Sequence, residues 1–140
     1  MASSPRIRTL QIIWAAMVAG VVIYTAVVAV VMRTGSTPSA SLDPSIMNLI
    51  GAGVLAYMVG GVFARRTMVE RIPRDAAPEA RMGAYQTAVI VGLALSESGG
   101  LILVTMGMLT GAPTWVLAGG GAAAILMFMA RPTGEEIGAD

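Results

Sequence analysis

AVIVGLALSESGG, residues 88–100, places one carboxyl group, that of Glu97, inside a long apolar segment. Glu97 is the only charged residue between Met82 and Ala130. An ionised carboxylate at the centre of a bilayer costs roughly 2.5–3.5 kcal/mol, so burial in hydrocarbon favours the neutral acid. A carboxyl group in this setting can take up and release a proton. The sequence therefore predicts a membrane segment with a protonatable group near its middle.

The composition assigns the whole chain to the membrane. Of its 140 residues, 56% are hydrophobic and 12% are charged, against about 25% charged residues in soluble domains, and the mean hydropathy is +0.76. We expect a single membrane domain, residues 1–140, in the cell inner (cytoplasmic) membrane. The chain has no cysteine and no histidine, which excludes disulfides, thiolate or imidazole metal sites and Cys–His or Ser–His catalysis. A net charge of +1 argues against nucleic-acid binding.

Four apolar segments predict an all-α protein with four transmembrane helices. Arg6 and Arg8 precede the first segment, which is longer than the roughly 7–15 apolar residues of a signal peptide and is therefore interpreted as an uncleaved anchor. Asp43 and Pro44 have the pattern of an N-cap followed by proline at the first helical position. The fourth segment is short for a crossing, and the tail after it is expected to be solvated. The predicted spans are 9–32, 44–64, 82–109 and 114–130.

The arginines predict the orientation. Eight of the nine lie before the first span, in the connection 65–81 or after the fourth span, and the loop 34–42 follows the remaining one, Arg33. Short loops rich in arginine stay on the cytoplasmic side. Both termini and the connection 65–81 are therefore predicted to be cytoplasmic.

Small residues recur at three- and four-residue spacing in the two central spans, which predicts faces where helices approach closely in lipid. In the second span these residues are Gly53, Ala56, Gly60 and Ala64. In the third span they are Ala88, Gly92, Ser96, Gly99 and Gly100.

The central pair of spans resembles the helical hairpin of subunit c, the proteolipid of the rotor ring in F-type ATP synthases. The residues that carry the resemblance are MVERIPRDAAPEAR, 68–81, similar to the family's polar loop, and VGLALSESGG, 91–100, similar to its carboxylate segment. It covers roughly residues 51–109. Two further spans flank this hairpin, and the family's glycine ladder is reduced here to Gly51, Gly53, Gly60 and Gly61.

The resemblance implies that Glu97 binds the translocated ion in a homo-oligomeric ring. Ser98 matches a serine that helps bind sodium in sodium-driven members, but Gly61 stands where those members carry a glutamine, so a proton is favoured over sodium. No other cofactor is implied. A ring of this kind needs a membrane partner subunit with an arginine or similar group to release the proton. Arg71, Arg74 and Arg81 are candidate loop contacts for a soluble partner, or serve only as a topology signal and as an attraction to anionic lipid headgroups.

Several site residues have a second interpretation. Glu97 is either an ion site or a neutral acid that hydrogen-bonds a neighbouring helix and holds an oligomer together. Ser96 and Ser98 are candidate supporting residues or simply bond the carbonyls of the preceding turn. Tyr57 is a candidate donor to Glu97 or a packing residue, with Asn48 as the alternative donor.

Two functions follow from these residues. The first is a ring-forming, subunit-c-like membrane protein with a proton-binding carboxyl group, within a proton-translocating complex. The alternative is a structural membrane oligomer or scaffold that uses the hairpin without moving ions. The sequence contains no phosphate loop, catalytic dyad or second intramembrane acid, so we expect no enzyme active site.

Overall fold

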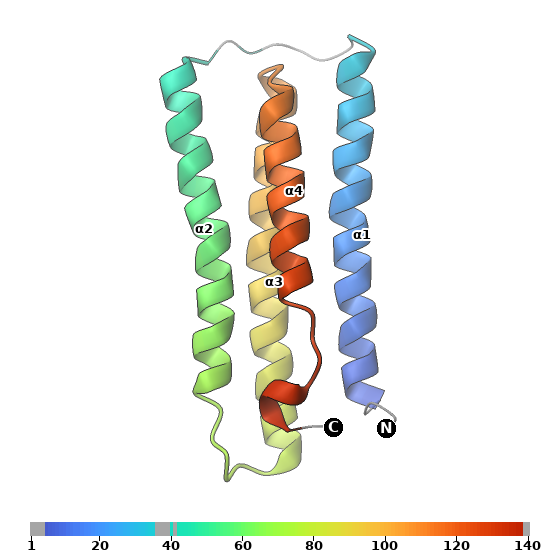
Figure 1. Cartoon of the computed structure of the whole chain (residues 1–140), viewed down its shortest axis with the longest axis vertical. Helices are drawn as coiled ribbons and strands as arrows, with labels where there is room; N and C mark the ends of the chain where they lie inside the picture. Colours follow the sequence, from blue (N-terminus) through green and yellow to red (C-terminus); the bar gives the residue numbers. More distant parts are fainter. Residues whose placement is uncertain (1–4, 36–39, 41, 139–140) are drawn as a thin grey trace.

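The computed structural model of the chain describes residues 5–35, 40 and 42–138. Within these residues the chain forms four α-helices and one short 3-10 helix (Figure 1). The helices are α1, Pro5–Arg33; α2, Pro44–Glu70; α3, Pro78–Leu109; α4, Pro113–Met129; and η1, Glu135–Ile137. The all-α class is confirmed. Most of the predicted loop 34–42 lies outside the described residues.

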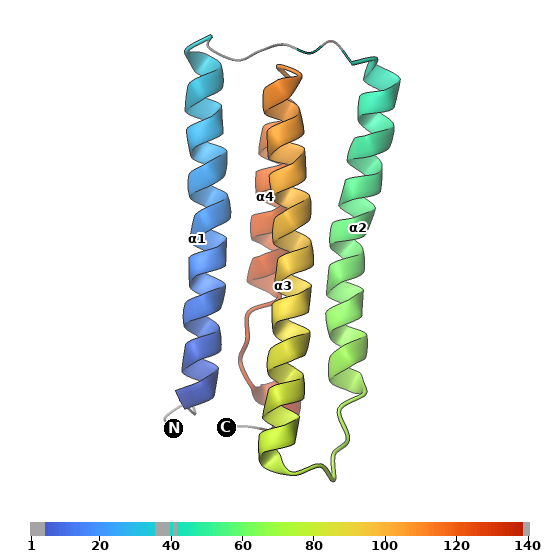
Figure 2. The same ribbon diagram turned by 180° about the vertical axis from the view of Figure 1, so that it is seen from behind.

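The bundle is built around α3, which packs against α1, α2 and α4. Figures 1 and 2 show α1 and α2 on opposite sides of the α3–α4 pair, so each outer helix has one face on this pair and another face away from it. Twelve α3 residues are buried, compared with five in each of the other three α-helices. The helix that carries Glu97 is therefore the centre of the fold.

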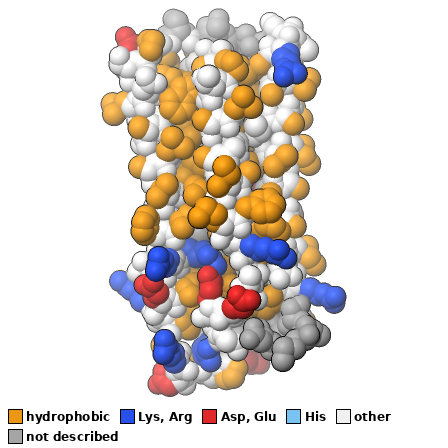
Figure 3. Space-filling view, in the orientation of Figure 1, with side chains coloured by type: hydrophobic (Ala, Val, Ile, Leu, Met, Phe, Trp, Pro, Cys, Tyr) orange, Lys and Arg blue, Asp and Glu red, His pale blue; other side chains and the backbone are white. Residues whose placement is uncertain are grey.

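The lengths and surfaces of the helices suggest a membrane-embedded protein. Helices α1, α2 and α3 are long and apolar enough to cross a membrane, and α4 is a shorter apolar helix of 17 residues. Large apolar side chains face outward, with Leu49 74% exposed and Phe63 64% exposed. Figure 3 shows apolar side chains along the bundle and most of the charged ones gathered at one end. We call this the arginine-rich end and the other the distal end.

Local sequence signals set the helix boundaries. The Asp43 carboxylate accepts a hydrogen bond from the backbone N–H of Ser45 at 2.7 Å, and Pro44 occupies the first turn, so the predicted N-cap is confirmed. This backbone hydrogen bond lowers the pKa of Asp43 because it stabilises the charged form. At the distal end, Gly111 has φ +65° in the turn from α3 to α4, a conformation that glycine adopts without steric cost.

Glycines also allow the central helices to approach each other. A Cβ added to Gly100 of α3 would collide with the Ala123 side chain of α4, and a Cβ added to Gly119 would collide with Leu103. On the other flank of α3, a Cβ on Gly92 would lie 2.7 Å from the Cβ of Arg65. The predicted small-residue face of α3 is therefore used within the chain, by α2 and α4.

The small-residue face predicted for α2 is used differently. Gly53 and Gly60 have open space where a Cβ would stand, and Ala56 is exposed. Gly51 and Gly61 make the close contacts instead, with Trp115 of α4 and with Leu95 of α3. The predicted stripe on α2 thus lies on a surface that the rest of the described chain leaves uncovered.

Candidate functional site

The Glu97 carboxyl group lies on the side of α3 that faces α1, and Figure 2 shows these two helices from behind. Glu97 is half-buried, and a Cβ added to Gly20 of α1 would stand 4.0 Å from its Oε1 atom. Gly20 lies one residue from the centre of α1, and Glu97 lies within one turn of the centre of α3. The two helices therefore place this carboxyl group near the middle of the apolar length.

Within the described part of the chain, Glu97 forms no hydrogen bond and no ion pair. Of the arginines on α2, Arg65 lies nearest to Glu97 along the helix axes. Arg65 packs on Gly92 of α3, which precedes Glu97 by five residues, or about 7–8 Å of helix. Arg65 is bound to Glu136. The carboxyl group is thus left with bonding capacity that another molecule can use.

The predicted supporting residues bond one another or the backbone. The Tyr57 hydroxyl pairs with Ser98 Oγ at 3.2 Å, so the structure connects Tyr57 to the neighbour of Glu97 and not to Glu97 itself. Ser96 and Ser98 donate to the carbonyls of Gly92 and Leu95 at 3.0 and 3.2 Å. These are the bonds to the preceding turn that serine commonly makes in helices.

Asn48 does not reach this level. It lies nine residues before Tyr57 in α2, about 13 Å along the axis, and lines a cavity at the distal end with Thr110 and Trp115. Of the two α2 residues proposed to donate a hydrogen bond to Glu97, Tyr57 is therefore the one that lies close to Glu97 along the bundle axis.

One polar pair in the interface between α1 and α3 was not predicted. The Tyr24 hydroxyl of α1 bonds Thr105 Oγ1 of α3 at 2.9 Å, in the same interface as Glu97 and Gly20. The signal was a tyrosine inside the first apolar segment, which was interpreted as an anchor alone. Helix α1 therefore contributes a polar contact to the interface that also contains the carboxyl group.

The C-terminal tail corrects the prediction that it is solvated. Pro132, Gly134 and Ile137 are buried, and Gln11 Nε2 donates to the Pro132 carbonyl at 3.3 Å. Because α4 ends at Met129, the tail occupies the space below it that a longer helix would fill (Figure 1). Trp14 Nε1 donates to the Met127 carbonyl at 2.7 Å, near the end of α4.

An ion pair between Arg65 and Glu136 holds the tail in place. Nη2 of Arg65 lies 2.9 and 2.7 Å from the two carboxylate oxygens of Glu136. The Arg65 side chain is only 10% exposed, whereas that of Glu136 is 39% exposed. Arg81 donates to the Ile137 carbonyl, and the Gly134 N–H donates to the Tyr85 hydroxyl at 3.4 Å.

Replacing Glu136 with alanine is expected to release the tail. Arg65 would keep a buried charge without its acceptor, which costs about 1–3 kcal/mol or more, and the chain can lower this cost by opening. Hydrogen exchange of residues 131–138 in detergent should accelerate. Glu135→Ala is the matched control, because Glu135 is exposed and has no ion pair among the described residues. Equal exchange in the two variants would contradict the role of Glu136.

The candidate loop contacts differ in their surroundings. Arg71 and Arg74 are exposed and Arg81 is half-buried. None of the three forms an ion pair with a residue that the structure describes. Their charges are therefore available to a ligand at the arginine-rich end.

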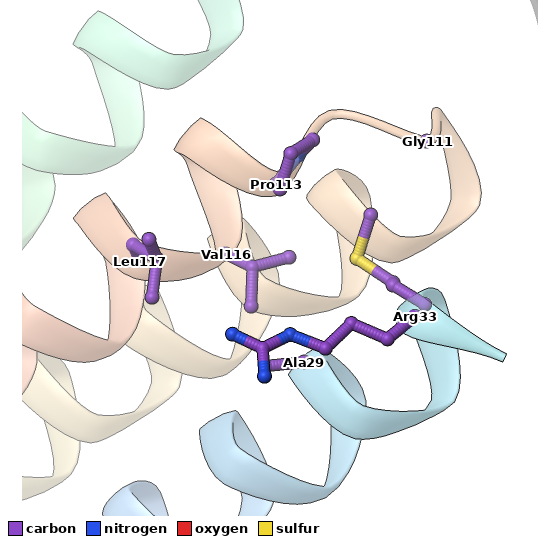
Figure 4. Close-up of a pocket in the computed structure, with 7 residues that line it drawn as sticks. Ala29, Arg33, Gly111, Pro113, Val116 and Leu117 are labelled. Atoms are coloured by element: carbon purple, nitrogen blue, oxygen red, sulfur yellow. The ribbon is translucent and has the colours of Figure 1, made fainter.

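A cavity of about 290 Å³ lies at the distal end, between the end of α1 and the start of α4 (Figure 4). Arg33 extends across it toward Val116. Arg33 follows Gly20 by 13 residues, about 20 Å along α1. This cavity is thus separate from the Glu97 groove.

Comparison with protein-family models, curated proteins and solved structures found no match to this chain. The described residues also contain no group of three or more aspartate or glutamate side chains able to hold a metal ion. The class that the fold defines is an all-helical, apolar bundle with a half-buried carboxyl group at mid-length.

Proposed function

We propose that this protein is a ring-forming integral membrane protein, similar to ATP-synthase subunit c, in which Glu97 is a proton-binding carboxyl group. In this proposal it crosses the cell inner membrane four times with both termini cytoplasmic. The observation that carries the proposal is the position of Glu97. It is a half-buried acid near the middle of the apolar length, without a partner among the described residues.

The physical argument concerns the charge of this group. An acid in an apolar groove is costly when ionised and without a partner, so it remains neutral until water or a cation reaches it. Each protomer would take up a proton at Glu97 when its groove faces an aqueous path, and carry it neutral past lipid. Because Glu136 already binds Arg65, the cation that releases the proton would come from a partner subunit.

The uncovered face of α2 supports an oligomer. Gly53, Ala56 and Gly60 present little side-chain bulk there, next to exposed apolar residues such as Val59 and Phe63. Small residues allow helices of neighbouring protomers to pack closely in lipid, where the hydrophobic effect supplies no attraction. A second copy of the chain can therefore approach α2 without displacing a helix of the same protomer.

The packing of α4 favours the alternative function, a structural oligomer or scaffold without ion translocation. Gly100 and Gly119 bring α3 and α4 into backbone contact, with the Gly100 carbonyl 3.1 Å from where a Cβ on Gly119 would stand. In a two-helix ring subunit, that flank of α3 would be open to a neighbouring protomer or to lipid. Here the chain covers it with its own helix, which restricts the ways a ring can form.

Labelling with a hydrophobic carbodiimide tests the proton site, because the reagent reacts with a protonated carboxyl group in an apolar setting. We expect one label per chain at Glu97, and less of it as the pH rises and the acid ionises. Mass spectrometry of peptides from the purified oligomer locates the label. The other seven acidic residues of the chain are internal controls. Labelling that is absent from Glu97, or independent of pH, would contradict the proposal.

A further inference from the structure

A cavity of about 480 Å³ lies at the arginine-rich end, enclosed by the end of α2, the α2–α3 connection, the first turns of α3 and the tail. Figure 1 shows η1 lying beside the start of α3, close to this connection. The lining is part charged and part apolar. The lining residues used below are Val69, Ile72, Arg74, Arg81, Glu136 and Ile137.

The charges around this cavity do not cancel locally. Of the two carboxylates that line it, Glu136 is bound to Arg65 and Glu70 is bound to Arg66 at 3.0 Å. The two lining arginines, Arg74 and Arg81, form no ion pair with any described residue. Asp75 and Glu79 belong to the same part of the chain but do not line the cavity. The cavity is therefore left with two uncompensated guanidinium groups.

Arg81 is bonded on one side only. Its Nη2 donates to the Ile137 carbonyl, whereas its buried Nε has no acceptor among the described atoms. A buried donor without an acceptor costs about 1–3 kcal/mol, so an acceptor that reaches this guanidinium is strongly favoured. Arg74 approaches the same space from the α2–α3 connection.

We infer that this cavity binds a phosphate group, with Arg81 and Arg74 as its ligands. Guanidinium groups match phosphate oxygens with short, charge-assisted hydrogen bonds. Val69, Ile72 and Ile137 provide an apolar wall beside the two arginines, which suits a phosphate carried on a less polar molecule. The tail closes one side, since Glu136 and Ile137 both line the cavity and are tied to α2 and α3.

Titration of the full-length protein in a neutral detergent tests this site. The probes are short-chain phosphatidylglycerol, followed by native mass spectrometry, and inorganic phosphate, followed by calorimetry. Arg74→Gln and Arg81→Gln should each weaken binding about tenfold, the loss of one charge-assisted contact. Arg8→Gln is the control, because Arg8 is an exposed arginine in the first turn of α1 and does not line the cavity.

Arg74→Gln decides the result if Arg81→Gln disturbs the tail, because Arg74 is exposed and forms no ion pair with a described residue. Binding of the lipid alone supports a headgroup as the source of the phosphate, and competition by inorganic phosphate supports a site for the free anion. The inference is overturned if neither probe binds. It is also overturned if Arg8→Gln weakens binding as much as Arg74→Gln, since attraction by overall positive charge would then suffice.

Discussion

Glu97→Gln is expected to leave the protein folded and assembled but without its protonatable group. Glutamine has nearly the shape of the protonated acid and keeps hydrogen-bonding atoms, so the half-buried position beside Gly20 can accept it. Carbodiimide labelling at residue 97 should fall to zero. The carbonyl band of a protonated carboxylic acid in the infrared spectrum at neutral pH should also disappear. Size-exclusion chromatography with light scattering should give the wild-type mass.

The same variant separates the two proposed functions. A proton carrier should lose all proton-dependent function of its complex with Glu97→Gln, while Glu97→Asp, which keeps an acid, should retain part of it. A scaffold should work equally well with the amide, because the amide still forms hydrogen bonds. Loss of the oligomer in Glu97→Gln would contradict both expectations, since a neutral side chain of nearly the same shape would then fail to support assembly.

Gly119→Leu is expected to cause the largest loss of stability. Leu103 and the backbone of Gly100 and Val104 occupy the space where this side chain would begin, with Val104 N 3.1 Å from the added Cβ. Backbone atoms cannot rotate away as a flexible side chain can, so α3 and α4 must separate. Overpacking of a well-packed interior costs about 1–3 kcal/mol and occasionally more, and we expect the upper end of this range. Thermal unfolding in detergent measures the loss.

Gly121→Leu is the matched control for this prediction. It makes the same chemical change two residues away in α4, where an added Cβ meets nothing within 4 Å. Both substitutions raise helix propensity by a similar amount, about 1 kcal/mol, so their difference isolates the packing term. A Gly121→Leu variant as unstable as Gly119→Leu would show that close approach of α3 and α4 is not the cause.

The middle and the start of α3 carry different chemistry, which bears on both proposals. Near its middle, α3 carries Glu97, which is half-buried and without a partner among the described residues. Near its start, Arg81 and Tyr85 bind the tail, and Arg65 and Glu136 form a partly buried ion pair. Arg65 is the arginine of α2 that lies nearest to Glu97 along the bundle axis, and its charge is neutralised within the chain by Glu136.

Much of the fold was predictable from local patterns. The break between α2 and α3 and the start of α3 at Pro78 follow from proline positions, whereas α2 continues past the change from apolar to charged residues at Arg65 and ends at Glu70. The cap at Asp43 followed from one residue type before a proline. These features depend on neighbours in the sequence, so the sequence contains the information for them.

The candidate site was predictable in its central residue but not in its surroundings. Glu97 was predictable because it is the only charged residue between Met82 and Ala130, which the sequence shows without a structure. Its neighbour Gly20 comes from α1, more than 70 residues away in the chain, and Tyr24 of the same helix bonds Thr105 of α3. Tyr57 lies close to Glu97 along the bundle axis, as predicted, but it does not bond Glu97. Successive residues of a helix are rotated by about 100°, so Ser98 faces α2 and Tyr57, whereas Glu97 faces α1.

By itself, the sequence determined that this protein is helical and apolar, that its apolar segments form four helices, and that one carboxyl group lies near the middle of the third. These properties follow from hydropathy, helix length and capping, which act over a few residues. The tertiary structure decided which face of each helix is covered: Gly51 and Gly61 are used on α2 in place of Gly53 and Gly60, and the polar tail is packed under the short α4. The reason is that close packing and buried charge depend on which distant groups meet, as Arg65 and Glu136 do across 71 residues of chain.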